Sequence, residues 1–187
     1  RRLMDKAISE KVLPGGQIIA ARGGRIFYRE RFGYHTYDKK QPVQHNHLYD
    51  LASVTKVSAT TLALMKQFDQ QKFELEDRLS RFIPALDTTN KDKLAFDDVL
   101  GHQARLAGWL PFYFETYEDF RKRELRKDIF RNHQEAEFSK QVAKDLYVSN
   151  SYRDSILQII YESSMKPFKR YKYSDLGFYL LKEFIES

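Results

Sequence analysis

The segment that most constrains this chain contains a hydroxyl and an amine, Ser53 and Lys56, three residues apart at the start of a helical pattern. From Ser53 to Gln70 the apolar residues recur at spacings of three, four and seven, which is typical of a helix with one buried side. These residues are Val54, Val57, Leu64, Met65 and Phe68, with Thr61 between them. Side chains three residues apart in a helix lie about 5–6 Å apart at Cβ, so the sequence predicts that the Lys56 amine reaches the Ser53 hydroxyl.

The chemistry of this pair has two interpretations. A serine hydroxyl is a weak nucleophile until a base accepts its proton, and a lysine is such a base only when its amine is neutral. Burial lowers the pKa of a lysine, and the positive end of a helix dipole acts in the same direction and favours an oxyanion beside the Ser53 N–H. The alternative is a helix-capping serine followed by a solvated lysine, and the S-x-x-K spacing alone does not exclude it.

Three segments, in order, resemble the serine β-lactamase and penicillin-binding-protein superfamily. Residues 48–56 resemble its nucleophile segment, the first part of a signature that continues with Tyr/Ser-x-Asn and K-T-G. Residues 99–108 resemble a family loop through His102, and residues 171–181 resemble the Tyr-x-Asn element of class C β-lactamases and their esterase and peptidase relatives. The last two segments are most similar to β-lactamase-like modules of Bacteroidetes, some of which are fused behind family-three glycosidases.

The resemblance implies a role for each residue of the site. Ser53 is the nucleophile, and Lys56 and Tyr173 form the base system, in which Tyr173 moves a proton between Ser53 and the leaving group. For Tyr173 the alternative is one more core aromatic in a chain that holds 12 tyrosines. Asp175 stands where the family more often has asparagine, and its carboxylate only accepts hydrogen bonds. We expect Asp175 to bind substrate or to position Lys56, and a lysine held charged by it would be a weaker base.

The resemblance also implies an α+β fold of the β-lactamase/transpeptidase type. We expect one partial domain over residues 1–187, with an N-terminal helix and a sheet hairpin in 1–50 and a helical region that carries the catalytic motifs in 51–187. No K-T-G triplet occurs in the chain. We therefore expect a truncated part of a longer protein, in which the C-terminal part of the sheet and the second oxyanion donor are absent and activity is weak or lost.

Local patterns predict the elements of the first 50 residues. Helical spacing covers residues 2–12, and two β-rich runs, 17–21 and 25–32, flank a turn at Gly23 and Gly24. This arrangement is typical of a β-hairpin.

The second half of the chain is expected to be mostly helical. A helix is predicted to start at Asp97 as its cap, and residues 112–170 are predicted to be helix-rich. The basic run 121–131 fits the solvated side of an amphipathic helix better than a nucleic-acid surface, because no groove-reading fold accompanies it. An aromatic cluster is expected to fill core rather than to wall a cleft; it consists of Trp109, Phe112, Tyr113, Phe114 and Tyr117.

Composition limits the other classes of function. The net charge of +6 and the pI of about 9.3 raise the question of nucleic acid, but we expect no such partner. There is no cysteine, and no apolar run approaches the roughly 18 residues of a membrane-spanning helix. The histidines of residues 45–47 are expected in a surface loop rather than a metal site, and His102 is expected to be a structural hydrogen-bonding residue rather than a base.

The sequence therefore predicts a serine hydrolase that cleaves an ester or an amide through an acyl-enzyme, without a metal or organic cofactor. The resembled group acts on β-lactams, small esters and D-amino-acid peptides, and fold alone does not choose among them. The alternative is a non-catalytic module that binds cell-wall peptide or braces a neighbouring domain. We further expect a periplasmic or cell-envelope location, a possible dimer through an exposed sheet edge, and a possible fused glycosidase domain in the full-length protein.

Overall fold

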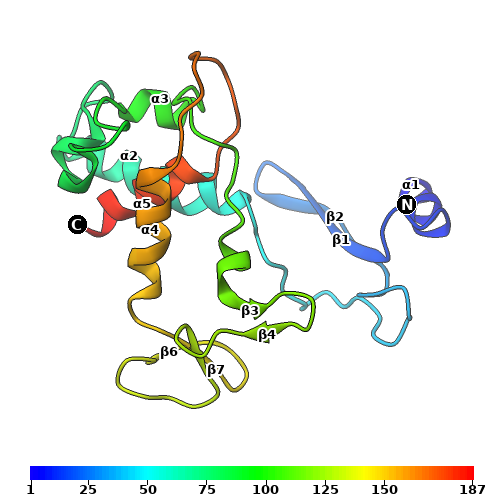
Figure 1. Cartoon of the computed structure of the whole chain (residues 1–187). Coiled ribbons are helices and arrows are strands. Elements are labelled where there is room, and N and C mark those ends of the chain that lie inside the picture. Colours follow the sequence, from blue (N-terminus) through cyan, green and yellow to red (C-terminus); the bar gives the residue numbers. More distant parts are fainter. The chain divides into compact units, whose positions relative to one another are not determined.

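A computed structural model describes residues 1–187, and the chain divides into two compact units, Arg1–Ala52 and Ser53–Ser187 (Figure 1). Each unit is described by itself below. No helix in the structure is both long enough and apolar enough to span a membrane.

The first unit consists of a short helix and a β-hairpin. Helix α1 spans Arg2–Ser9, and the antiparallel strands β1 and β2 span Gly15–Arg22 and Arg25–Gly33. The turn between the strands places Gly23 and Gly24 at φ values of 56° and 74°, a left-handed conformation that glycine adopts without steric cost. The predicted helix and hairpin are confirmed. The predicted loop around residues 45–47 is also present, as a turn.

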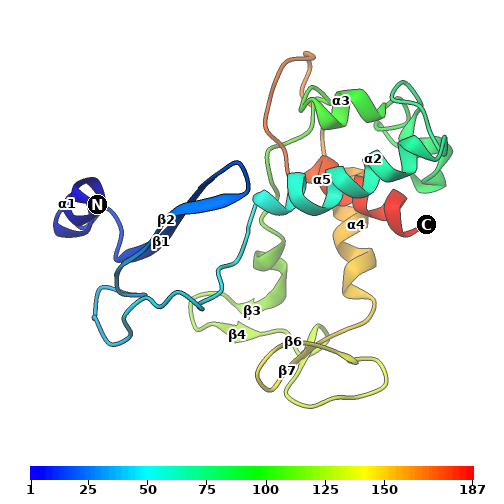
Figure 2. The ribbon, with the colours of Figure 1, turned by 180° about the vertical axis from the view of Figure 1, so that it is seen from behind.

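Helices surround the core of the second unit. A π-helical turn at Lys56–Thr60 leads into α2, Thr61–Asp69, and is followed by two 3₁₀ turns, Leu79–Arg81 and Pro84–Leu86. The remaining helices are α3, Phe96–Leu100, α4, Tyr152–Glu162, and α5, Leu176–Glu186. Helix α5 lies against the π turn and against α3 (Figure 2).

Four phenylalanines form the centre of this core. Phe73, Phe82, Phe96 and Phe184 pack with ring centroids 4.2 to 5.7 Å apart, mostly edge to face. Such pairs contribute about 0.5–1.5 kcal/mol each beyond the area they bury. Because Phe184 belongs to α5, this cluster fixes the helix that follows Tyr173.

The helix predicted after Ser53 is present, but its predicted buried face is wrong. Leu64 is buried, whereas Val57 and Met65 are 63% and 60% exposed, and Val54 and Phe68 are also exposed. The side turned into the unit instead carries Lys56 and Leu64. A π turn uses i→i+5 hydrogen bonds, so it rotates the residues before it relative to those after it, and a regular 3.6-residue period no longer holds.

The prediction of a helix-rich segment over residues 112–170 is also wrong. A 3₁₀ turn at Phe112–Thr116 precedes five short strands, and α4 is the one α-helix of this segment. The strands are β3, Tyr117–Asp119, β4, Glu124–Leu125, β5, Phe130–Arg131, β6, Lys140–Ala143, and β7, Leu146–Val148. They form a β3–β4 pair and an antiparallel sheet of order β5-β7-β6.

The basic run 121–131 is therefore not an amphipathic helix. Arg123 lies in the turn between β3 and β4 with φ of 57°, a conformation incompatible with a right-handed helix. Lys122 pairs with Asp119, and Arg126 pairs with Asp128. The first of these ion pairs lies at the β3–β4 turn, and the second lies just after β4.

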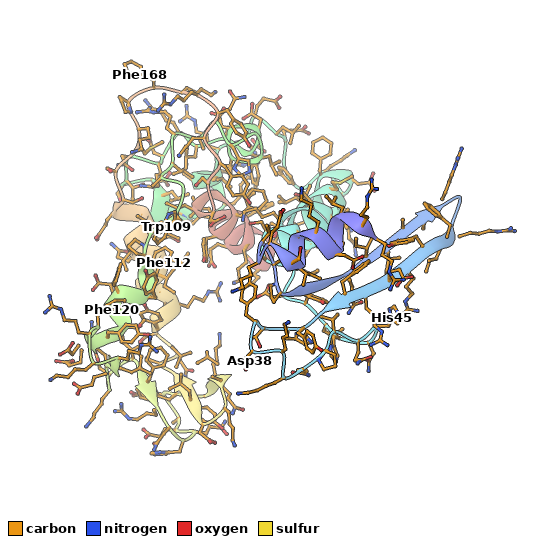
Figure 3. The ribbon with its side chains drawn as sticks, turned by 90° about the vertical axis from the view of Figure 1, so that its right-hand side faces the viewer. Asp38, His45, Trp109, Phe112, Phe120 and Phe168 are labelled. Carbon is orange, nitrogen blue, oxygen red and sulfur yellow. The ribbon has the colours of Figure 1, made fainter.

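The expectation that the aromatic cluster fills core is wrong for most of its members. Trp109, Tyr113 and Phe114 are exposed, and Phe112 alone packs against the main core. Figure 3 shows Trp109, Phe112 and Phe120 one below another within the second unit. Tyr113 and Phe114 pack on each other and on Phe120, so aromatic contacts form locally around the β3 turn.

Asp97 is not the cap of α3. Ala95 occupies the N-cap position, and the Asp97 carboxylate accepts a hydrogen bond from the N–H of Asp98 at 2.6 Å within the first turn. The backbone N–H of Asp97 donates to the carbonyl of Leu75, and the N-cap of the helix lies two residues before the predicted one.

Gly177 provides a test of the packing that positions the site. A Cβ at this position would lie 2.5 Å from Val99 Cγ1, on α3. Alanine favours a helix by about 1 kcal/mol over glycine, but overpacking costs about 1–3 kcal/mol. We expect Gly177→Ala to lower the free energy of unfolding, measured in urea. Gly16→Ala is the control, because its Cβ would meet only Met4 at 3.7 Å; an equal loss in both variants would contradict the prediction.

Candidate active site

Ser53 stands at the start of the helix, as the sequence predicted. The residues from Val54 onward are helical, and the Lys56 N–H donates to the Ser53 carbonyl at 3.1 Å. The preceding residue, Ala52, has φ of 43°, in the left-handed region that costs a non-glycine residue about 1–2 kcal/mol. A strained residue held next to a hydroxyl at a helix start is the kind of feature that gathers at functional sites.

The π turn positions Lys56. The N–H and the hydroxyl of Thr61 both donate to the Lys56 carbonyl, the hydroxyl at 2.7 Å. Ser58 Oγ donates to the carbonyl of Val54 at 2.9 Å. Turns of this kind are frequent at functional sites because they change the direction of a side chain within a helix.

The structure brings the four predicted site residues together. Lys56 Nζ lies 3.3 Å from Ser53 Oγ and 2.5 Å from Asp175 Oδ1. The same ammonium lies 5.1 Å from the centre of the Tyr173 ring, within range of a cation–π interaction. Lys56 is only 15% exposed, so its charge is stabilised by these neighbours rather than by bulk water. The contacts follow from the fold of one unit, Ser53–Ser187.

Lys56 is held in its charged form. Burial lowers the pKa of Lys56, but the hydrogen bonds to Asp175 and Tyr173 outweigh burial, and the net pKa is raised above the ordinary value. The expectation that burial makes this amine neutral is therefore wrong, because a carboxylate replaces water as its partner. The weaker base expected from an aspartate at position 175 agrees with this direction.

Tyr173 shifts in the opposite direction. The neighbouring Ser53 hydroxyl, followed by the Lys56 ammonium, lowers the pKa of the Tyr173 phenol. A phenol with a lowered pKa reaches its anionic form more readily and can accept a proton at a lower pH. Of the two residues predicted to form the base system, Tyr173 is therefore the easier one to deprotonate, and Lys56 is the positive charge that stabilises its anion.

The segment that carries Tyr173 and Asp175 is fixed by hydrogen bonds to residues 102–108. Ser174 Oγ donates to the carbonyl of Ala107 at 2.6 Å, and the Asp175 N–H donates to the carbonyl of Gly108 at 2.7 Å. Ser174 is buried, and its hydroxyl also accepts a hydrogen bond from the N–H of Leu176 at the start of α5. Ser174 was not among the predicted site residues, although a serine close to the start of a helical run is a recognisable capping signal.

His102 has the hydrogen-bonding role that the sequence predicted. Its Nδ1 accepts from the Ser174 N–H at 3.2 Å, and its carbonyl accepts from the Lys172 N–H at 2.8 Å. Its ring packs against that of Tyr173 with centroids 4.5 Å apart. Burial, followed by the Lys56 charge, lowers the pKa of His102. A lowered pKa favours the neutral ring, whose Nδ1 can accept the hydrogen bond from the Ser174 N–H.

These residues line a cleft of about 390 Å³. Its polar groups are Ser53, Lys56, Tyr173 and His102, and its apolar wall includes Val57 and Phe178, in a lining completed by Thr61 and Leu100. Two larger cavities of the same unit, of about 550 and 660 Å³, contain neither Ser53 nor Tyr173. The chemically equipped cleft is therefore the candidate active site.

The whole chain matches one known family. The family described as Beta-lactamase matches residues 1–187, so the chain belongs to the β-lactamase family. The resemblance to the serine β-lactamase and penicillin-binding-protein superfamily and the predicted α+β fold are thereby confirmed. The similarity to Bacteroidetes modules remains a prediction.

The chain is also similar to individual proteins with cell-wall activities in their names. The chain is 29% identical over 133 residues to the N-acetylmuramyl-L-alanine amidase of Bacillus subtilis, covering 63% of this chain and 30% of that protein. It is 35% identical over 115 residues to a putative D-alanyl-D-alanine carboxypeptidase of Escherichia coli, covering 53% of this chain and 26% of that protein. The alignments thus span about a quarter to a third of these relatives.

A solved structure supports the fold. The octameric penicillin-binding protein homologue from Pyrococcus abyssi superposes with a TM-score of 0.67 at 20% identity, over 99% of this chain and 37% of that chain. At this identity the likeness concerns the fold alone.

The Lys56–Asp175 pair makes a prediction about pH. Asp175 raises the pKa of Lys56, so Asp175→Asn should lower the pKa of Lys56 and release its proton at a lower pH. NMR titration of ¹³C-dimethylated lysines in the folded chain measures this directly. Asp119→Asn, which removes the partner of Lys122 instead, is the matched control and should leave Lys56 unchanged. An unchanged or raised pKa of Lys56 in Asp175→Asn would refute the electrostatic assignment.

Proposed function

We propose that this chain carries the nucleophile and the proton-transfer groups of a serine hydrolase that cleaves an ester or an amide through an acyl-enzyme. The observation that supports this most strongly is the convergence of Ser53, Lys56 and Tyr173 on one cleft, with Lys56 held by Asp175 at 2.5 Å. A hydroxyl, a phenol with a lowered pKa and a fixed cation are the groups that nucleophilic catalysis on a carbonyl requires.

In the proposed acylation step, Ser53 Oγ attacks the carbonyl carbon while the Tyr173 oxygen takes the Ser53 proton. The new C–O bond converts the carbonyl to an oxyanion, and the Ser53 N–H at the positive end of the helix stabilises that charge. Collapse of the oxyanion breaks the bond to the leaving group, to which Tyr173 returns the proton. Water then attacks the acyl carbon and gives a proton to Tyr173; the bond to Ser53 Oγ breaks, Tyr173 returns the proton to that oxygen, and the acid product leaves.

Lys56 acts in this proposal as a permanent positive charge. Its ammonium favours the anionic form of Tyr173 and lies within hydrogen-bond reach of the Ser53 oxygen. Asp175 keeps it charged and correctly placed. This assignment follows from the raised pKa of Lys56, which makes it a poor proton acceptor at neutral pH.

Substrates are proposed from the names of the relatives. N-acetylmuramyl-L-alanine and D-alanyl-D-alanine are chemical units of cell-wall peptide, and both bonds are amides. We therefore place D-amino-acid peptides first, with β-lactams and small esters as other substrates of the same chemistry. A periplasmic or cell-envelope location follows from such a substrate. A fused glycosidase and a dimer through the hairpin edge remain predictions.

One observation favours a second candidate, a non-catalytic module that binds cell-wall peptide. An aspartate at position 175 makes Lys56 a firm ion-pair partner and presents a carboxylate where an amide would recognise substrate. Such a site can bind a peptide amine without acylation. The two candidates differ in whether Ser53 becomes covalently modified.

Covalent labelling separates the two candidates. We expect a fluorophosphonate probe to add one label to the chain, seen by intact mass, and Ser53→Ala to abolish it. Ser58→Ala is the matched control, because Ser58 is an exposed serine on the next turn of the same helix. A label that persists in Ser53→Ala would contradict the assignment of the nucleophile, and an absence of any label would favour the binding module.

A double-mutant cycle tests whether Lys56 and Tyr173 act as one unit. Groups that act together lose similar amounts of rate alone and in combination, so Lys56→Ala, Tyr173→Phe and the double variant should reduce the labelling rate to a similar extent. Lys56→Arg should retain more rate than Lys56→Ala, because an arginine preserves the charge that the proposal requires. Strictly additive losses in the cycle would mean that the two residues act separately.

A further inference from the structure

The connection between α4 and α5 forms a basic and aromatic surface that the proposed chemistry does not use. Residues 164–172, here called the α4–α5 loop, contain four lysines and arginines and no aspartate or glutamate. Figures 1 and 3 show the loop projecting from the helices, with Phe168 at its outer end.

Most of the charge on this loop is uncompensated. Lys169 pairs with Asp98, whereas the side chains of Lys166, Arg170 and Lys172 make no ion pair or hydrogen bond in the structure. The turn between β3 and β4 is different, because Asp119 pairs with Lys122 and neutralises part of its basic charge. The α4–α5 loop is thus a concentrated positive surface.

Two aromatic side chains accompany these cations. Phe168 is 77% exposed and has no aromatic partner, and Tyr171 is 69% exposed with its edge toward the ring of His102 at 6.0 Å. A phenylalanine this exposed keeps most of its apolar area in water. Burial of such a side chain is favourable by about 1.5–3 kcal/mol, so a partner that accepts it gains binding energy.

The base of the loop is fixed, which keeps its tip directed outward. Lys166 and Arg105 are joined by two hydrogen bonds, from the Lys166 N–H at 2.7 Å and from Arg105 Nε at 2.6 Å. At the other end the Lys172 N–H donates to the His102 carbonyl at 2.8 Å. The segment between Lys166 and Lys172 therefore projects from the unit and does not pack on the core.

We propose that the α4–α5 loop docks the protein on the surface of an anionic phospholipid bilayer. Cations near such a surface are attracted to its negative potential, and an adjacent aromatic ring enters the interfacial region. A soluble anionic polymer would also attract the cations, but it offers no apolar layer for Phe168. The combination of Phe168 with Lys166 and Arg170 is what favours the bilayer.

Vesicle co-sedimentation of the full chain tests this docking. We expect binding to vesicles of phosphatidylglycerol and phosphatidylcholine that weakens with added salt, and little binding to pure phosphatidylcholine. Each cation removed should weaken binding about fivefold, so Lys166→Gln with Arg170→Gln should weaken it about 25-fold. Phe168→Ser should weaken it about tenfold.

The β3–β4 turn supplies the matched control. Phe120→Ser with Arg121→Gln and Arg123→Gln removes an exposed aromatic and two exposed cations elsewhere and should leave vesicle binding unchanged. Circular dichroism confirms that each variant is folded. No binding to phosphatidylglycerol vesicles, or an equal loss in the control, overturns the proposal. Binding that depends on the cations but not on Phe168, matched by equal binding to polyphosphate, also overturns it and indicates an anionic polymer.

Discussion

The ion pair between Lys56 and Asp175 is the contact on which the candidate site depends. It joins two residues 119 positions apart, one at the first turn of the helix after Ser53 and one at the start of α5, at 2.5 Å. A charge that is mostly withdrawn from water is strongly unfavourable unless a partner replaces the water. The pair therefore fixes both segments with respect to each other and decides which of the cleft residues is charged.

The packing of the second unit supplies the precision that this contact requires. The phenylalanine cluster around Phe184 fixes α5, and the hydrogen bonds of Ser174 and His102 fix the two residues before it. On the other side, the π turn rotates Lys56 inward at the expense of a regular helix. A wider turn, a left-handed Ala52 and a partly buried cation are each unfavourable locally, and their gathering around one hydroxyl is consistent with a functional site.

The surfaces of the second unit differ in kind. Met65 and Phe68 expose apolar area on α2 and line a cavity of about 660 Å³ together with Phe73. The α4–α5 loop exposes cations and Phe168 instead. The concentrated positive charge of the loop suits an anionic interface. The two surfaces lie on different elements.

Local sequence patterns were enough to predict the candidate groups of the site and to indicate the family. The S-x-x-K spacing, the Tyr173 segment and the hairpin around Gly23 and Gly24 are patterns among neighbouring residues, so the sequence alone is enough to predict them. Three other features depend on the tertiary structure and cannot be predicted from periodicity and composition. The pKa of Lys56 rises because Asp175 faces it across 119 residues. The short strands β3–β7 replace the expected helices, and their turns use left-handed Arg123 and Asp145, which no glycine marks in the sequence. The inner face of the Ser53 helix follows a π turn that no regular period predicts. Contacts between residues distant in the sequence set charge and burial, and a single sequence carries only weak signals for them.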